Sequence, residues 1–301
     1  ARARFGMFCL LLRLQIEPAW YHARTRDKEI VNEMVNVARN REHQDFDMAE
    51  DANAFVLLSV QTEAGFVEVF DWNGTHWEQR GERLTAVGGS SHRWGSHWGS
   101  AQPVTISANG KKVVVGDPNS ANNIGSVTVY DWDGMRWQDR TIRVGNTMNS
   151  FLGSSVALSA EGDTLVVGGT DPCGRLWRLP WNGTKWETEG YVQRDDDAVC
   201  GNGIINRFGW SSAISADGLT VASGGPQHNV IPSLPFAAVY TWNGTNLEQV
   251  GVDIQGPRGS VFGNLVSLSS DATVLAVGEY GTYRNTDFAP LPLRTWVYEF
   301  K

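Results

Sequence analysis

The sequence contains little of what would cross-link the chain or carry it through a membrane. It has only 3 cysteines among 301 residues. Cys173 and Cys200 lie in loop-like segments, where a disulfide and a pair of unpaired thiols both fit the pattern. The apolar run Met7–Leu12 is far shorter than the roughly 20 residues that a membrane-spanning helix needs. We therefore predict no transmembrane segment.

Positive charge and catalytic motifs are scarce as well. The chain has 25 lysines and arginines against 33 aspartates and glutamates, a formal net charge of −8. Nucleic-acid binding needs clustered lysine and arginine, so no nucleic-acid partner is expected. A nucleophile elbow, a phosphate-binding loop and a paired-acid motif are all missing. Asp195–Asp197 and the oxygen-rich segment 117–123 are more typical of solvated loops than of cation sites. The sequence predicts a protein that is not an enzyme and holds no metal or cofactor.

What the chain does contain is glycine and tryptophan, 33 and 13 residues, with only 5 methionines. This composition is typical of short strands joined by turns. One motif recurs five times: an alternating apolar run, a turn such as Trp-Asn-Gly, and a second aromatic or apolar residue. The copies are Val67–Trp77, Val127–Trp137, Leu179–Trp186, Val239–Leu247 and the shorter Trp296–Phe300.

A second signature precedes each of these copies. It reads Phe-Gly, small apolar residues, Leu-Ser-x-Asp-Gly, and an apolar run that ends in glycine. It begins at Leu152, Phe208 and Phe262 in three copies, and the first copy, Met48–Leu57, lacks the Phe-Gly. The residue before the turn falls at 49, 107, 159, 215 and 269, a spacing of 52 to 58 residues.

Each repeat predicts one four-stranded blade. Asp-Gly and Asn-Gly indicate tight hairpin turns, because both residues tolerate positive φ. A four-stranded meander cannot bury both faces alone, so blades must stack around an axis. We predict an all-β fold: a β-propeller of about five blades over residues 41–301. The repeat tryptophans are expected to pack between blades; they are Trp72, Trp77, Trp132, Trp137, Trp181, Trp186 and Trp242.

These two signatures resemble the FG-GAP repeat, the blade of the integrin α-subunit head. The resemblance covers residues 41–301, implies a propeller, and favours an extracellular or membrane-surface location. Integrin-type blades bind calcium through an Asp-rich loop between their first two strands. Here that loop is reduced to Ser-Ala-Asp-Gly, which cannot supply the roughly six to eight oxygens that calcium needs, so no calcium site is carried over. The family also usually closes with more blades than the five counted here.

The five copies leave the ring to be closed. The last copy stops where its fourth strand should start, and an unpaired edge is a liability for a sheet. The apolar segment 8–16 is predicted to pair with Trp296–Phe300 and complete the last blade. Residues 28–38, with apolar residues at helical spacing, are predicted to form a short helix in an N-terminal extension, 1–40. The alternative is that 1–40 is the remnant of a sixth blade.

Two sets of residues are candidates for binding or modification. The first lies at blade starts, where an aromatic, histidine-rich loop could bind a sugar or a protein, or simply occupy the Phe-Gly position; it comprises His92, Trp94, His97, Trp98 and Trp210. The histidines are five positions apart without helical context, which is a poor zinc pattern. The second comprises three Asn-Gly-Thr sequons at Asn73, Asn182 and Asn243. Their recurrence in register with the repeat favours plain hairpin turns over glycosylation.

Three functions follow from this pattern. The first is a non-catalytic interaction module or scaffold that binds a protein partner through its loops. The second is a lectin-like propeller that binds a glycan. The third is a carbohydrate-active enzyme with carboxylates at the central channel, which has the least support because no catalytic motif is present.

Overall fold

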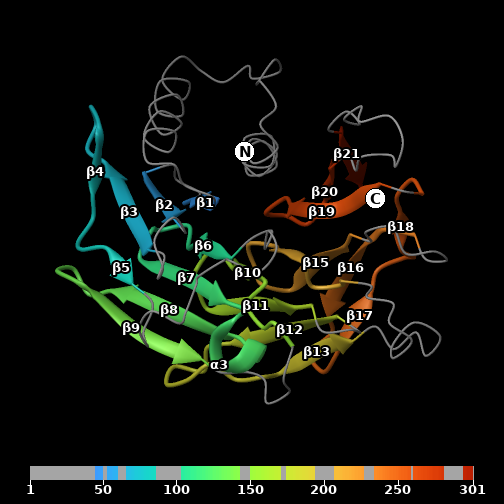
Figure 1. Ribbon diagram of the computed structural model, residues 1–301, viewed down its shortest axis with the longest axis horizontal. Helices are drawn as coiled ribbons and strands as arrows, with labels where there is room; N and C mark the ends of the chain where they lie inside the picture. The colour runs from blue at the N-terminus through green and yellow to red at the C-terminus, as the bar shows by residue number, and fades with distance from the viewer. Residues whose placement is uncertain are drawn as a thin grey trace.

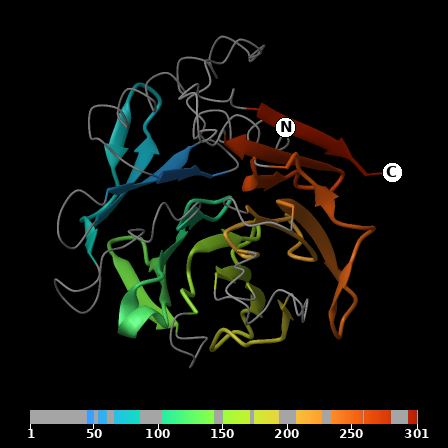
Figure 2. The same ribbon diagram turned by 45° about the vertical axis from the view of Figure 1, so that its right-hand side comes forward.

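The structure is a computed structural model. It describes residues 45–49, 53–59, 66–85, 103–142, 150–170, 174–193, 207–226, 234–258, 260–280 and 294–300. In these ranges the strands form five antiparallel sheets that follow one another in chain order around a common centre (Figures 1 and 2). This arrangement is a β-propeller of five blades and confirms the predicted fold. No helix in these ranges is long and apolar enough to cross a membrane.

The blades have one plan, a meander in which each strand pairs with the next. Blade 1 holds β1 (Asp45–Met48), β2 (Ala54–Ser59), β3 (Phe66–Trp72) and β4 (Trp77–Gln79), with β5 (Leu84–Thr85) beside β3. Blade 2 holds β6 (Val104–Ile106), β7 (Lys112–Asp117), β8 (Ser126–Trp132) and β9 (Trp137–Ile142), with the single turn α3 (Ser120–Asn123) between β7 and β8. Blade 3 holds β10 (Ser155–Leu158), β11 (Thr164–Gly169), β12 (Arg175–Pro180) and β13 (Gly190–Gln193). Blade 4 holds β14 (Ser211–Ile214), β15 (Thr220–Gly225), β16 (Phe236–Trp242) and β17 (Leu247–Gln249), with β18 (Ile254–Gln255) beside β16. Blade 5 holds β19 (Val261–Leu268), β20 (Val274–Tyr280) and β21 (Arg294–Glu299).

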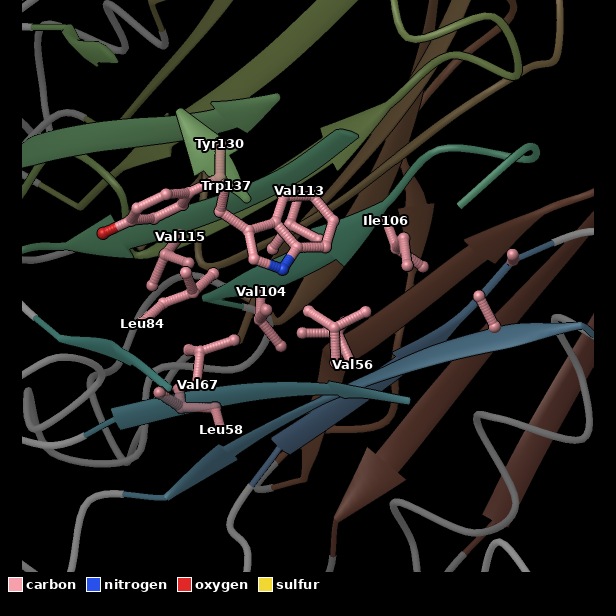
Figure 3. Close-up of a cluster of buried hydrophobic side chains, with 13 residues drawn as sticks. Val56, Leu58, Val67, Leu84, Val104, Ile106, Val113, Val115, Tyr130 and Trp137 are labelled. Carbon is pink, nitrogen blue, oxygen red and sulfur yellow. The ribbon is translucent and has the colours of Figure 1, made fainter. Parts of the chain in front are cut away.

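The hydrophobic core lies between the blades rather than within any one of them. Alternation along a strand directs successive side chains to opposite neighbours. Val113 and Val115 of β7 pack toward blade 1, whereas Val114 packs toward blade 3. Figure 3 shows the seam between blades 1 and 2, where Val56 and Tyr130 belong to the same buried cluster. A blade therefore gains most of its apolar burial only when its neighbour is in place.

The Phe-Gly signature joins blades 3, 4 and 5 each to the blade before it. Phe208 is fully buried, and Gly209 has a φ of +86° that favours glycine. A Cβ on Gly168 of blade 3 would collide with the carbonyl of Gly209 in blade 4. The same approach joins Gly224 to Gly263. The glycine that ends each apolar run and the glycine of Phe-Gly are therefore two halves of one close backbone contact.

Arginines and tryptophans form an outer seam between neighbouring blades. Arg80 of blade 1 lies over the rings of Trp132 and Trp137 in blade 2. Arg140 of blade 2 lies over Trp181, in the turn region of blade 3, with its guanidinium carbon 5.2 Å from the ring centroid. These contacts place Trp132, Trp137 and Trp181 between blades, as the sequence predicts, and add a cation–π attraction to their packing. Trp72 and Trp77 instead pack together within blade 1, where Trp77 also contacts Phe55.

Blade 5 differs from the others at its outer edge. Val239 of β16 is 3% exposed, whereas Val297, at the equivalent position of β21, is 51% exposed. The described part of the chain pairs β21 on one side only, with β20. The segments predicted to form a closing strand at 8–16 and a helix at 28–38 lie outside the described residues, so the N-terminal extension stays a prediction.

Candidate functional site

The strands of each blade end at two opposite faces of the propeller. Because neighbouring strands run antiparallel, the turns after the first and third strands lie on one face. This turn face carries 107–110, 159–162, 215–218 and 269–272, together with 73–76, 133–136, 182–185 and 243–246. The opposite loop face carries the starts of the first strands and the connections between the second and third. Its described residues include Ser120, Phe151, Arg207 and Trp210.

Backbone hydrogen bonds join the turns of successive blades at the centre of the turn face. The amide of Ala108 donates to the carbonyl of Ala160 at 3.0 Å, and that of Ala160 to Ala216 at 3.1 Å. The amide of Ala216 continues the series to Ser270 at 2.9 Å. Polar backbone groups that could recognise a ligand here already bond to the next blade.

The serine before each of these turns has a structural role. Ser215 is 1% exposed, and its hydroxyl donates to Asp217 and accepts from the amide of Thr220 at 2.9 Å. The same pair of bonds recurs at Ser107 and Ser269. Repetition of one buried arrangement from blade to blade identifies these serines as turn residues rather than nucleophiles.

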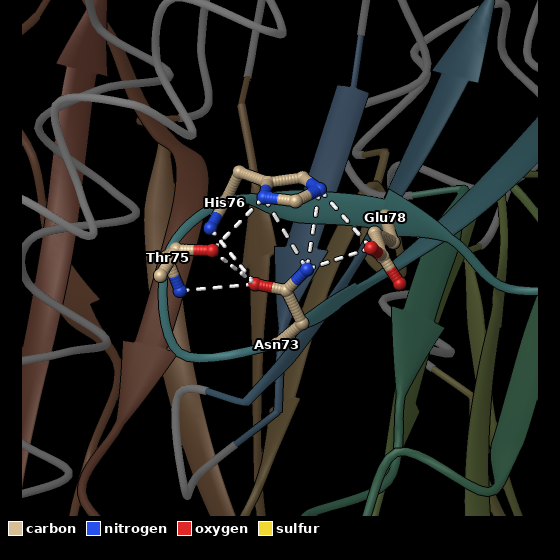
Figure 4. Close-up of polar contacts among 4 residues, drawn as sticks. All are labelled: Asn73, Thr75, His76 and Glu78. Carbon is tan, nitrogen blue, oxygen red and sulfur yellow. Dashed lines mark hydrogen bonds and ion pairs between the residues drawn. The ribbon is translucent and has the colours of Figure 1, made fainter.

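The Asn-Gly turns differ from the predicted type in one respect. Only the glycine has positive φ, +101° at Gly74, whereas Asn73 acts through its side chain. Its Oδ1 accepts the amides of Thr75 and His76, and its Nδ2 donates to Glu78 at 2.6 Å (Figure 4). An asparagine carbonyl thus replaces a backbone acceptor, which explains why the motif prefers Asn or Asp there.

The three sequon asparagines occupy this turn in blades 1, 3 and 4. Asn182 and Asn243 also donate from Nδ2 to a glutamate five residues later, at 2.7 and 2.6 Å. Each asparagine is exposed, but the nitrogen that would carry a glycan already has a partner. Asp133 takes the position in blade 2, and the direction of the bond reverses, since Gln138 donates to it. Two backbone amides, with Gln138, lower the pKa of Asp133 to about 2. The three asparagines form the hairpin turns that the sequence favours, and their glycosylation stays the less favoured alternative.

The loop face carries residue-specific chemistry in place of repetition. At the start of blade 4, the guanidinium carbon of Arg207 lies 5.0 Å from the ring centroid of Trp210. The indole is 3% exposed, and its Nε1 donates to Oδ1 of Asn264 in blade 5 at 3.0 Å. Burial lowers the pKa of Arg207, although an arginine remains charged at neutral pH. We take Arg207, Trp210 and Asn264 as the candidate site.

Only one of the five predicted binding residues falls in this site. Trp210 is placed, whereas His92, Trp94, His97 and Trp98 lie outside the described residues. Trp210 is buried beneath Arg207, so its ring could stack on a sugar only if the arginine moved away. Sequence reasoning missed Arg207 and Asn264. Arg207 directly precedes a Phe-Gly copy, and that position is the signal that could have identified it.

The described residues contain no cluster of three or more His, Cys, Asp or Glu side chains that could hold a metal ion. Three described carboxylates are buried: Glu68, Asp117 and Glu279. Glu279 accepts a hydrogen bond from Nε1 of Trp296 at 2.8 Å, and Glu68 pairs with Arg83. Asp195–Asp197, Cys173 and Cys200 lie outside the described residues, so their roles are untested.

No protein-family model matches the sequence, and no curated protein matches it. Solved structures are similar in fold. Hydrazine synthase of Kuenenia stuttgartiensis has a TM-score of 0.51 at 14% identity, covering 85% of this chain and 62% of that one. The β-propeller domain of Myceliophteria thermophila Cps50 (Swd1) has a TM-score of 0.49 at 14% identity, with 78% and 65% covered. TolB of Acinetobacter baumannii has a TM-score of 0.44 at 13% identity, with 80% and 48% covered. This chain spans less than two thirds of the length of each, and the likeness shows the fold alone.

Proposed function

We propose that this chain is a non-catalytic β-propeller module that binds a protein partner through its loop face. The observation that carries the proposal is the difference between the two faces. The turn face repeats the same internal bonds in successive blades. Among the described residues, the loop face holds a stacked arginine–tryptophan pair, Arg207 and Trp210, only in blade 4. Binding residues are found disproportionately on loops that a rigid scaffold positions.

The rigidity of the scaffold favours binding over a moving catalytic site. Neighbouring blades share their cores, and their glycine contacts leave no room for displacement at Gly168 or Gly224. Described loop-face residues that pack on this frame, such as Trp210, lose little conformational entropy on binding. The FG-GAP resemblance supports the same function, since integrin α heads are interaction domains.

A lectin function has less support at the candidate site. Stacking on a sugar requires an exposed aromatic ring, and Trp210 is 3% exposed. A glycan array probed with the folded protein is expected to show no binding above background.

Insertion of a small folded tag at each face tests the proposal. One tag goes between Ala121 and Asn122, both exposed on the loop face, and the matched control goes between Met135 and Arg136 on the turn face, where Met135 is 88% exposed. Each tagged chain is expressed in its native cells, and the size of the assembly that contains it is measured by native fractionation.

We expect the turn-face chain to elute with the untagged assembly and the loop-face chain to elute as a free protein. Equal melting temperatures of the two purified chains would exclude misfolding as the cause. A loop-face tag that leaves the assembly intact, or a turn-face tag that alone disrupts it, would contradict the proposal.

A further inference from the structure

We propose that Arg207 is an anchor for a carboxylate, and that the partner presents an acidic segment to the loop face at the start of blade 4. This inference rests on the proposed function and names the chemistry of the partner. Its ligand is an aspartate or glutamate side chain of another protein, seated on a guanidinium that Trp210 and Asn264 hold in place.

The first argument is the state of the guanidinium. Arg207 is half-buried, and within the described ranges its guanidinium stacks on Trp210 without a hydrogen bond or an ion pair. A charge removed from water costs free energy unless a partner compensates it. A ring face offers part of that compensation, and a carboxylate in the bidentate geometry that arginine favours would offer much more.

The second argument comes from the other arginines that stack on tryptophan. Arg80 and Arg178 lie over tryptophans of the next blade, and each also pairs with a carboxylate of its own blade, Asp71 and Glu189. Arg140 lacks a carboxylate within the described residues but is exposed to water. Arg207 combines partial burial with the absence of a described carboxylate. The stacking of Arg207 on Trp210 therefore resembles that of Arg80 on its tryptophans, but a carboxylate equivalent to Asp71 is not found among the described residues.

The third argument is the way that the site is held. Arg207 has a φ of +51°, a conformation that costs a non-glycine residue free energy. Phe151 occupies the same turn position in blade 3 and has a φ of +47°. The positive φ is therefore shared by the two blades, whereas the arginine side chain occurs at this position in blade 4 and not in blade 3. Asn264 clamps the indole from the adjacent blade, and its Nδ2 makes no hydrogen bond within the described residues. The guanidinium of Arg207 and the acceptor oxygen of Asn264 therefore both contact one buried ring.

Peptide binding tests this inference directly. The probe is a fluorescently labelled peptide of six glutamates, with six glutamines as the neutral control, measured by polarisation at low salt. The principal variant is Arg207→Gly, because glycine accepts the positive φ and removes the guanidinium without adding backbone strain. Arg207→Lys keeps the charge but loses the planar fork. Arg140→Met removes an exposed arginine from another tryptophan and is the matched control.

We expect the glutamate peptide to bind the native chain and the glutamine peptide not to bind. Arg207→Gly should weaken binding by about tenfold, the usual value of a charged hydrogen bond. Arg207→Lys should lose about threefold, since a lysine charge persists without bidentate geometry. Arg140→Met should bind as the native chain does. Equal binding by Arg207→Gly and the native chain would overturn the inference.

A further variant checks whether the chain satisfies its own arginine. Asp195–Asp197 precedes Arg207 in the sequence, and all three aspartates are changed to asparagine. If the native chain fails to bind the peptide and this variant binds it, Arg207 is occupied internally and the inference is wrong. Failure of the peptide test with loss of assembly on loop-face tagging would remove this anchor but keep the proposed function. An intact assembly after loop-face tagging would remove the proposed function itself.

Discussion

The turn face and the loop face are the two ends of the same strands, yet they are stabilised in different ways. On the turn face, blades 2, 3 and 4 repeat one solution: a buried serine, a glycine at positive φ and an Asx side chain that accepts backbone amides. On the loop face the common element is the glycine contact between blades, and the side chains around it differ from blade to blade. The comparison teaches that repetition here reports architecture, and departure from repetition reports a candidate site.

The largest expected effect on stability is at the glycine contact between blades 3 and 4. Gly168→Ala would force a Cβ into the carbonyl of Gly209 in the next blade, where neither backbone can withdraw without opening the seam. We expect it to lower the free energy of unfolding by about 3 kcal/mol, as overpacking does in a tight interior. Chemical denaturation measures this effect.

The matched control for that variant lies on the turn face. Gly183 has a φ of +96°, but a Cβ there would meet nothing within 4 Å. Gly183→Ala should therefore cost only the backbone strain, about 1 kcal/mol. Equal losses for the two glycines would show that the interblade contact does not limit stability.

An intermediate effect is expected at the buried serines of the turn face. Ser215→Ala leaves the amide of Thr220 and the carboxylate of Asp217 without the hydroxyl between them. We expect a loss of about 1.5 kcal/mol in the free energy of unfolding. The converse variant Ala49→Ser, in the blade that lacks this serine, serves as the comparison. A stability gain from Ser215→Ala would contradict the role assigned to the serine.

The smallest effect concerns the pH dependence of the turn face. The pKa values of Asp133 and Asp271 are each lowered to about 2 by hydrogen bonds within their turns. A lowered pKa in the folded state adds stability above the unfolded value, and this stability is lost as the pH falls from about 4 toward 2. Asp133→Asn and Asp271→Asn should each flatten the decline of the denaturation midpoint over that range.

Both replacements have a precedent in the chain. Asn73 occupies the turn position of Asp133, and Asn109 occupies that of Asp271, where it also accepts the bond from its serine. The variants should therefore fold at neutral pH with little change in stability. An unchanged pH profile in the double variant would show that these two carboxylates do not contribute to acid unfolding.

The sequence predicted the architecture well because blade formation depends on local, repeated signals. Hairpin turns, alternating apolar runs and the spacing of 52 to 58 residues identified the five blades and the seams where the repeat tryptophans lie. The role of the asparagine in its turn was predicted less well. Its side-chain carbonyl replaces a backbone acceptor, and only the geometry of the turn separates that role from positive φ.

The candidate site could be predicted only in part. Trp210 stood out because it departs from the repeat, but its burial and its bond to Asn264 join residues 54 positions apart in neighbouring blades. The sequence marks Arg207 only by its position before a Phe-Gly copy, and its lack of a carboxylate partner among the described residues is visible only in the structure. That information is held in the packing of blade 4 against blade 5.

The sequence by itself therefore determined the strand-turn plan of each blade, because that plan depends on residues within a few positions of one another. The tertiary structure alone decided which glycines meet and which of the described arginines pair with a described carboxylate. Those outcomes depend on contacts between segments that lie roughly one repeat apart in the sequence. The spacing of residues along the chain does not show how closely two such segments approach each other in the fold.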